Sequence, residues 1–175
     1  MTFRYGPAAR FFHWTTVILV VVMIALGAWI KDFEPQDKAF KLELLNLHQS
    51  FGVLLFVVVV LRLFVRLGNP PPMLYDQPAL IRVGSRLNHY ALYAMLLIQP
   101  VIGFLTTNAL GIPVKWFGLF TIPSPIGKQD KAIAEQFAEA HELGAFLLIV
   151  LITLHLLGAA YHGIIRQDGV VKRMV

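Results

Sequence analysis

The sequence has no cysteine among its 175 residues. This absence excludes disulfide bonds, thiolate metal sites, iron–sulfur clusters and covalent cofactor attachment through a C-x-x-C-H motif. Any metal or metal-containing cofactor must therefore be held by histidine, methionine or carboxylate side chains.

Charge is also scarce. Only 14% of the residues are Asp, Glu, Lys or Arg, 57% are hydrophobic, and the mean hydropathy is +0.67. Such a chain is too apolar for an ordinary soluble domain, so we predict a membrane protein in contact with lipid. The 15 basic residues outnumber the 10 acidic ones, which in so apolar a chain indicates charge asymmetry across a bilayer and not a nucleic-acid partner.

Four apolar stretches are long enough to cross a hydrocarbon core, which takes about 20 helical residues. They run approximately from residue 11 to 30, 44 to 67, 87 to 110 and 137 to 165. We predict an all-α fold in which residues 1–175 form one transmembrane domain, a four-helix bundle with up-down-up-down topology. The first stretch is interpreted as a retained anchor and not as a cleaved signal, because it is long, lacks a following A-x-A site and precedes three further spans.

The segments that flank and connect these spans differ in charge. The two termini and the second connection hold nine basic residues and only two acidic ones, Asp76 and Asp168; the basic residues are Arg4, Arg10, Arg62, Arg66, Arg82, Arg86, Arg166, Lys172 and Arg173. By the positive-inside rule, both termini are cytoplasmic. The second connection contains GNPPPMLYDQP, which predicts a stiff cytoplasmic link. The third contains KWFGLFTIPSPIGKQDK, whose aromatic residues suit a short surface segment or cap on the outer side.

All six histidines fall within the predicted spans, where ionisable side chains are costly and usually functional. The first three spans hold one each, and the fourth holds the other three: His13, His48, His89, then His141, His155 and His162. The alternative for any single one is a hydrogen bond to a neighbouring helix.

Helical geometry pairs four of these histidines. His141 and His155 are fourteen residues apart, so they lie within about 40° of one helix face and about 21 Å apart along the axis. His155 is the one nearer the cytoplasm, where the first span enters with His13. His141 is near the outer surface, where the second span enters with His48. The topology therefore predicts two facing pairs at two depths.

Two facing imidazoles can bind a bare metal ion or the two axial positions of a haem iron. A structural zinc usually takes four ligands, and HELGA lacks the second histidine of H-E-x-x-H because Ala145 stands there. Haem fits better than a bare ion. A porphyrin needs room beside its ligands, and a glycine follows three of the paired histidines by three or four residues: Gly52, Gly144 and Gly158. Ordinary close helix packing is the alternative for these glycines. Two bis-histidine haems favour electron transfer over oxygen binding.

With these pairs, the sequence resembles the prokaryotic cytochrome b561 family, small four-helix membrane cytochromes with two haems. The resemblance covers essentially the whole chain and rests on RFFHW, LHQSFGVLLFVVVVLRLFVRL, RLNHYALYAMLLIQPVIG, AHELGA, LHLLGAAYH and VVKRMV. It implies that His13 and His155 ligate a cytoplasmic-side haem b, and that His48 and His141 ligate an outer-side haem b. These are the pairs that topology predicts.

The resemblance also implies a function in a bacterial inner membrane. The leading expectation is a superoxide oxidase that passes electrons from periplasmic superoxide through both haems to ubiquinone. The alternative is a haem b subunit that relays electrons between a periplasmic redox partner and the quinone pool; the lack of a long soluble extension favours the self-contained enzyme. A haem-free proton relay or transporter would leave the paired depths unexplained.

Further residues are candidates for cofactor contacts. His162 lies about 10 Å nearer the cytoplasm than His155, where it can donate a hydrogen bond or a proton to quinone; an interfacial histidine beside lipid headgroups is the alternative. His89, one turn after Arg86, is a candidate for a haem propionate or quinone contact, with a helix–helix contact as its alternative. The inner arginines Arg10, Arg82 and Arg86 suit propionates, and snorkelling explains them equally well.

Four lysines on the predicted outer side can attract an anion such as superoxide. These are Lys31, Lys115, Lys128 and Lys131. Their acidic neighbours leave no obvious positive excess: Asp32, Glu34, Asp37, Asp130, Glu135 and Glu139.

Overall fold

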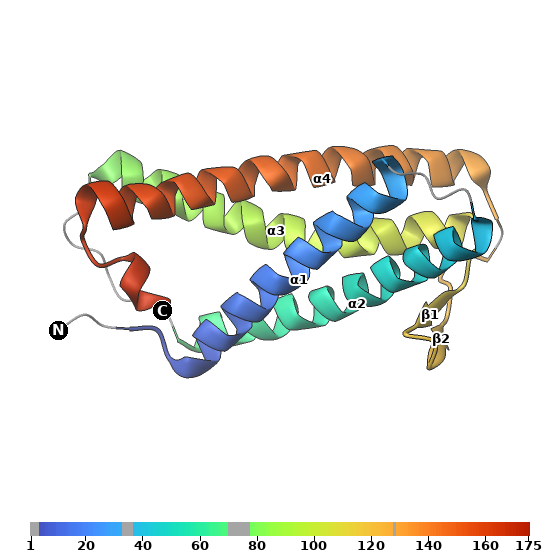
Figure 1. The fold of residues 1–175 in the computed structure, drawn as a ribbon, viewed down its shortest axis with the longest axis horizontal. Helices are drawn as coiled ribbons and strands as arrows, with labels where there is room; N and C mark the ends of the chain where they lie inside the picture. The colour runs from blue at the N-terminus through green and yellow to red at the C-terminus, as the bar shows by residue number, and fades with distance from the viewer. Residues whose placement is uncertain (1–3, 33–36, 70–77, 128) are drawn as a thin grey trace.

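In a computed structural model, the chain forms four long helices that run in alternating directions (Figure 1). The structure describes residues 4–32, 37–69, 78–127 and 129–175. The helices are α1 (Pro7–Asp32), α2 (Lys38–Gly68), α3 (Ala79–Ala109) and α4 (Lys131–Ala160), and each contains a segment long and apolar enough to span a membrane. The predicted all-α transmembrane bundle is confirmed.

The helices begin before the predicted apolar stretches. The Asp37 carboxylate accepts a hydrogen bond from the Ala39 N–H at 2.8 Å, and the Asp130 carboxylate accepts one from the Ile133 N–H at 3.0 Å. These N-caps start α2 and α4 about six residues before the predicted spans, because hydropathy detects only the apolar part of a helix whereas capping stabilises its polar first turns. Residues 70–77, most of the predicted proline-rich link, lie outside the described residues.

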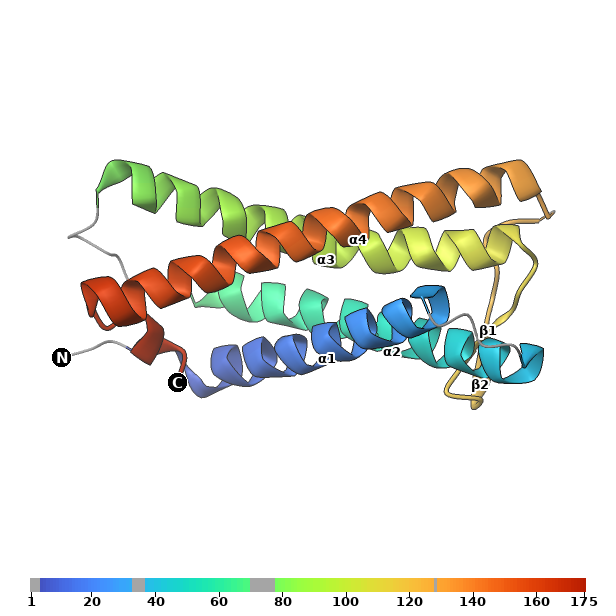
Figure 2. The same ribbon diagram turned by 45° about the horizontal axis from the view of Figure 1, so that its top comes forward.

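The bundle consists of two helix pairs. Among the described residues, α1 packs on α2, α3 packs on α4, and α2 joins the two pairs through α3, whereas α1 and α4 contact each other very little. Figure 2 shows the start of α1, the end of α2 and the end of α4 at one end of the molecule, opposite the end that holds the short strands. The weakly packed side between α1 and α4 is therefore the most open side of the bundle.

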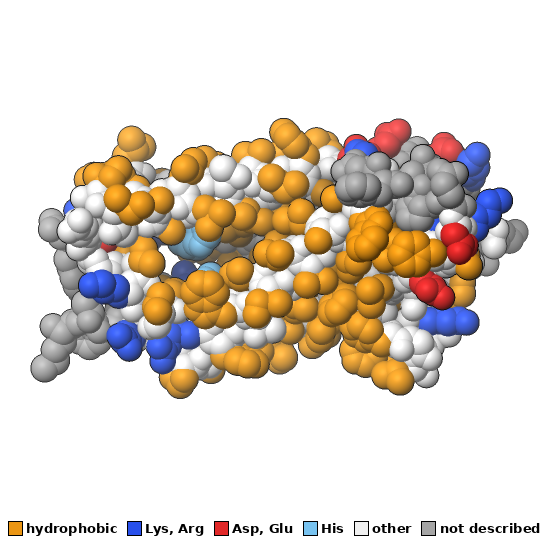
Figure 3. All heavy atoms as spheres, in the orientation of Figure 1, with side chains coloured by type: hydrophobic (Ala, Val, Ile, Leu, Met, Phe, Trp, Pro, Cys, Tyr) orange, Lys and Arg blue, Asp and Glu red, His pale blue; other side chains and the backbone are white. Residues whose placement is uncertain are grey.

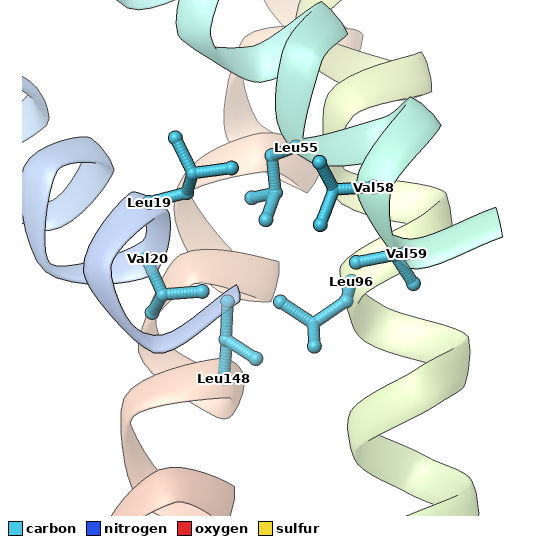
Figure 4. Packing of buried hydrophobic residues seen from close by; sticks show 7 residues of the cluster. All are labelled: Leu19, Val20, Leu55, Val58, Val59, Leu96 and Leu148. Atoms are coloured by element: carbon cyan, nitrogen blue, oxygen red, sulfur yellow. The ribbon is translucent and has the colours of Figure 1, made fainter. Parts of the chain in front are cut away.

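A cluster of buried aliphatic side chains fills the middle of the bundle, and we call it the central apolar layer (Figure 4). It contains Leu19, Val20, Leu55, Val58, Val59, Leu96 and Leu148, so all four helices contribute. Leu148 is seven residues from both His141 and His155, which places this layer about 10 Å along α4 from each of them. The space-filling view shows hydrophobic side chains along the middle and charged side chains near both ends (Figure 3), as expected for a protein surrounded by lipid.

The predicted outer surface segment forms a β-hairpin. Strand β1 (Val114–Trp116) pairs antiparallel with β2 (Phe120–Ile122), and Phe117 and Gly118 turn the chain with positive φ angles of 46° and 74°. The Phe117 N–H donates to the Ser50 hydroxyl at 2.8 Å, which ties the hairpin to α2. This part of the sequence therefore covers the first half of α2.

The chain after α4 folds back onto α1. A turn of π-helix (Tyr161–Arg166) ends α4, Gln167 and Gly169 have φ angles of 50° and 77°, and a short 3-10 helix follows (Val171–Arg173). Three donors near the start of α1 bind carbonyl oxygens of this last stretch. The Tyr5 N–H donates to Arg173 at 3.0 Å, the Arg10 guanidinium to Val175 at 3.0 Å, and the Trp14 indole to Met174 at 2.9 Å. We call residues 167–175 the C-terminal segment.

Candidate functional site

The structure brings together both of the predicted histidine pairs. His13 of α1 faces His155 of α4 with ring centres 6.4 Å apart, and His48 of α2 faces His141 of α4 with ring centres 6.3 Å apart. All four side chains are half-buried. In Figure 3, histidine and basic side chains are visible at the bottom of a recess in the half of the molecule that carries the termini.

The spacing within each pair suits a metal between the rings. A metal–imidazole bond of about 2 Å on each side, plus about 1 Å from each ring nitrogen to its ring centre, separates the ring centres by about 6 Å. The buried Nδ1 atoms of His48 and His141 have no hydrogen-bond partner among the described residues. A buried polar atom without a partner costs free energy, so these rings fit a site where a bound group makes further contacts.

The protein ligands suit haem better than a bare ion. Within the described part of the chain, no group of three or more His, Asp or Glu side chains could hold a metal ion. A haem needs only two axial ligands from the protein, because the porphyrin supplies the other four. Two facing imidazoles at each of two depths match that requirement.

After their predicted sides, we call His48 and His141 the outer pair and His13 and His155 the inner pair. Two glycines not predicted from the sequence lie against the outer pair. A Cβ atom at Gly103 of α3 would be 3.0 Å from Cε1 of His141, and one at Gly27 of α1 would be 3.5 Å from Cε1 of His48. These positions leave room for the imidazoles themselves. The signal was visible as glycine inside apolar helices, but the facing residues depend on helix rotation, which spacing alone does not determine.

The glycines that were expected to make room for porphyrin have different surroundings. A Cβ at Gly144 would be 2.6 Å from the amide nitrogen of Gln99, and one at Gly52 would be 3.5 Å from the end of Met23. The buried Gln99 donates from this amide to the backbone carbonyl of His141 at 2.9 Å. Gly144 therefore makes room for a residue that supports His141, which corrects the expectation, whereas no protein atom lies within 4 Å of a Cβ at Gly158.

The inner pair lies in a larger polar cluster. The ring of His89 is 5.2 Å from the ring of His155, so His89 joins the inner pair. Arg62 of α2 places Nη2 2.8 Å from Nδ1 of His13 and lies over the ring of Tyr93 at 5.2 Å. From the sequence, Arg62 was predicted only as a cytoplasmic-side charge, although an arginine within the apolar run VVVVLRLFV is a visible signal of a buried role.

The arginines predicted as propionate partners lie near the starts of α1 and α3. Arg10 donates to the Val175 carbonyl in the C-terminal segment. Arg82 is half-buried and Arg86 is exposed in the first turns of α3. The arginine in hydrogen-bond contact with a paired histidine is Arg62.

His162 points into the protein. Its side chain is 9% exposed, and its Nδ1 is 2.7 Å from a carboxylate oxygen of Asp168. The same carboxylate accepts the Val170 N–H at 3.2 Å and lies 3.6 Å from Arg166 Nε. This burial does not fit the alternative of an interfacial histidine beside lipid headgroups.

The surroundings of Asp168 keep it ionised. Burial raises the pKa of this carboxyl, but the His162 and Val170 hydrogen bonds and the Arg166 charge outweigh burial and hold the pKa below its ordinary value of 3.8. Because the pKa of Asp168 is lower in the folded segment than in the unfolded chain, its ionised carboxylate stabilises the fold at any pH above the ordinary pKa. This stabilisation is lost as the pH falls through the lower, folded-state pKa.

We therefore expect Asp168→Asn to loosen the C-terminal segment at pH 7. The substitution removes a charge-assisted hydrogen bond, so amide hydrogen exchange of residues 170–174 should accelerate about tenfold. Wild-type protein should show the same acceleration only below pH 3.8, after correction for intrinsic exchange rates. Glu139→Gln removes an exposed carboxylate elsewhere and serves as the control. Equal exchange in wild type and Asp168→Asn at pH 7 would contradict the role of this carboxylate.

Ion pairs are found among the lysines considered for anion attraction. Lys31 pairs with Glu142, the residue after His141, and Lys131 Nζ is 3.8 Å from a Glu135 oxygen. Lys115 is exposed on β1, and Lys128 lies outside the described residues. Two of these lysines therefore have their charge offset by a nearby carboxylate.

Comparison with known proteins gives matches over nearly the whole chain. Residues 4–175 match the family described as prokaryotic cytochrome b561. The chain is 34% identical over 174 residues to cytochrome b561 homolog 2 of Escherichia coli (strain K12), covering 98% of this chain and 91% of that protein. It is 25% identical over 168 residues to the probable superoxide oxidase CybB of Yersinia pestis, which covers 93% of this chain and 90% of that protein. It is 24% identical over 173 residues to cytochrome b561 homolog 1 of Escherichia coli (strain K12), which covers 98% of this chain and 97% of that protein.

Proposed function

Because this chain belongs to the prokaryotic cytochrome b561 family, whose members transfer electrons through haem b in membranes, we propose that it holds two haems and oxidises superoxide with ubiquinone as the electron acceptor. The observation that carries the two-haem proposal is the pair of histidine contacts at two depths, each with ring centres about 6 Å apart. The whole chain, residues 1–175, acts as one domain in this proposal.

Each haem has its own ligand pair in this proposal. His13 and His155 hold the inner haem b, and His48 and His141 hold the outer haem b. Gln99 fixes the backbone at His141, and the facing glycines Gly27 and Gly103 give the outer imidazoles their space. His89 is proposed to contact a propionate or quinone from its place beside His155, and Arg86 contacts a propionate near the start of α3.

Electrons move from the outer side inward. Two superoxide anions each give up one electron and leave as O₂, and one ubiquinone takes up the two electrons and two protons. A bis-histidine haem supplies reversible one-electron chemistry without opening a coordination position. The protein fixes the ligands, keeps an apolar layer between the two sites, and holds His162 against Asp168, where it can pass a proton to quinone near the inner site.

The proposed location is the bacterial inner membrane, with both termini in the cytoplasm. The excess of basic residues in the terminal and second-connection segments supports this orientation. Superoxide then reaches the outer pair from the periplasm, whereas quinone in the bilayer and cytoplasmic protons reach the inner end. Similarity to a probable superoxide oxidase over 93% of the chain supports the choice of donor.

We expect superoxide to reduce the purified protein directly. Pulses of superoxide should produce the reduced haem b absorbance within the mixing time of a stopped-flow instrument, and added ubiquinone should reoxidise it. Superoxide dismutase added beforehand should abolish the reduction. If the haems stay oxidised under superoxide but can be reduced by dithionite, the superoxide proposal is wrong and a periplasmic redox protein becomes the candidate donor.

A further inference from the structure

Arg62 carries a positive charge inside a membrane-spanning helix. It lies in the apolar run of α2 and is half-buried. A guanidinium stays protonated in proteins and only donates hydrogen bonds. Its Nη2 lies 2.8 Å from Nδ1 of His13, so a fixed positive charge lies directly beside a ring of the inner pair.

The described groups that interact with Arg62 offer it no negative charge. They are Arg66, Tyr5, Tyr93 and the three inner histidines His13, His89 and His155. Tyr93 helps to hold the guanidinium, through its ring face and a side-chain hydrogen bond. Burying a cation without a counter-charge in a low-dielectric region costs free energy. A functional role for the charge would explain why Arg62 stands there.

A fixed cation also favours any nearby centre that gains negative charge. With haem held at both pairs, reduction of the inner haem would add one electron there, and the outer haem would supply that electron and be oxidised. Arg62 itself would release no proton in this step, because a guanidinium stays protonated. At the outer pair, the described contacts of His48 and His141 include the uncharged residues Gly27, Gly103 and Gln99.

We propose that Arg62 is a positioning residue that sets the redox poise of the inner site: its charge, held against His13 by Tyr93, raises the reduction potential of the inner haem and draws electrons inward. This inference rests on the proposed ligation by His13 and His155. It does not depend on superoxide or on ubiquinone as the reaction partners.

The test is a spectroscopic redox titration of the haem-loaded protein. Arg62→Gln should lower the reduction equilibrium constant of the inner haem about tenfold, which is about 59 mV for a one-electron couple, and leave the outer haem unchanged. Arg62→Lys should stay close to wild type, because it keeps the charge. Lys172→Gln, which removes an exposed charge from the C-terminal segment, should also stay close to wild type.

Each outcome decides the proposal. An unchanged potential in Arg62→Gln would overturn it, and so would an equal fall in Arg62→Lys and Arg62→Gln. If Arg62→Gln fails to load the inner haem, Arg62→Met takes its place as the variant without the charge: a fall of about tenfold supports the charge effect, and an unchanged potential overturns it. A wild-type preparation with one haem per chain would instead contradict the two-haem proposal. If His13→Ala removes that single haem, it is the inner haem, and its potential in the Arg62 variants still tests the role of Arg62.

Discussion

Replacing His48 or His141 by alanine should lower the haem b content from two per chain to one. In the proposed assignment, each outer histidine supplies one of the two axial bonds of the same haem, so loss of either ligand should remove that haem while the inner pair stays intact. His13→Ala and His155→Ala should likewise leave only the outer haem. Pyridine haemochrome quantification of the purified proteins measures the haem content, and the redox titration identifies which haem remains.

The control for the ligand variants is His162→Ala. This substitution also removes a membrane-depth imidazole, but His162 binds Asp168 and not a facing histidine. It should keep both haems. Two haems in all four ligand variants would show that the assignment is wrong, and a loss of both haems in every variant would show that the two sites do not form independently.

Replacing Gly103 by leucine should remove most of the outer haem and spare the inner one. A Cβ at this position would already be 3.0 Å from Cε1 and 3.3 Å from Nδ1 of His141, so the larger side chain must displace the imidazole. A displacement of about 1 Å is enough to disrupt a binding site that depends on precisely placed ligands. The haem-per-chain ratio and the redox titration again measure the outcome.

Gly84→Leu provides a matched control for Gly103→Leu. Gly84 also lies in α3, but no atom is within 4 Å of a Cβ there, and the residue is exposed. Both variants add the same side chain to the same helix, so a general effect on helix stability would appear in both. Full outer haem in Gly103→Leu would contradict the close contact with His141.

The spans and the histidine pairs could be predicted from the sequence because they depend only on properties of single helices and on the order in which the helices cross the membrane. Hydropathy locates an apolar segment, and the helical period determines which face and depth a residue such as His155 occupies. The order of the spans then pairs His155 with His13. Their approach in the structure follows from that geometry, whereas their role as ligands stays a prediction.

Other features depend on how helices rotate against each other and on folded connections. The contact of Arg62 with His13 and the packing of Gly103 on His141 require the rotation of two helices to be known. The fold-back of the C-terminal segment depends on left-handed residues, among them Gln167, which is a residue type with no strong preference for that conformation. Hydropathy carries no information on either point.

The central apolar layer gives electron transfer an electrical cost. The two paired histidines of α4 are about 21 Å apart in a hydrocarbon core of about 30 Å, so an electron moving between the sites crosses about two-thirds of the membrane field. A full crossing by one charge corresponds to about 2.3 kcal/mol per 100 mV, and this path to about 1.5 kcal/mol. Inward transfer moves negative charge toward the negative side of an energised membrane. In the proposed two-haem arrangement, each inward electron would therefore store part of the driving force between donor and acceptor in the membrane potential, so the pair of sites would be an electrogenic element within the bilayer.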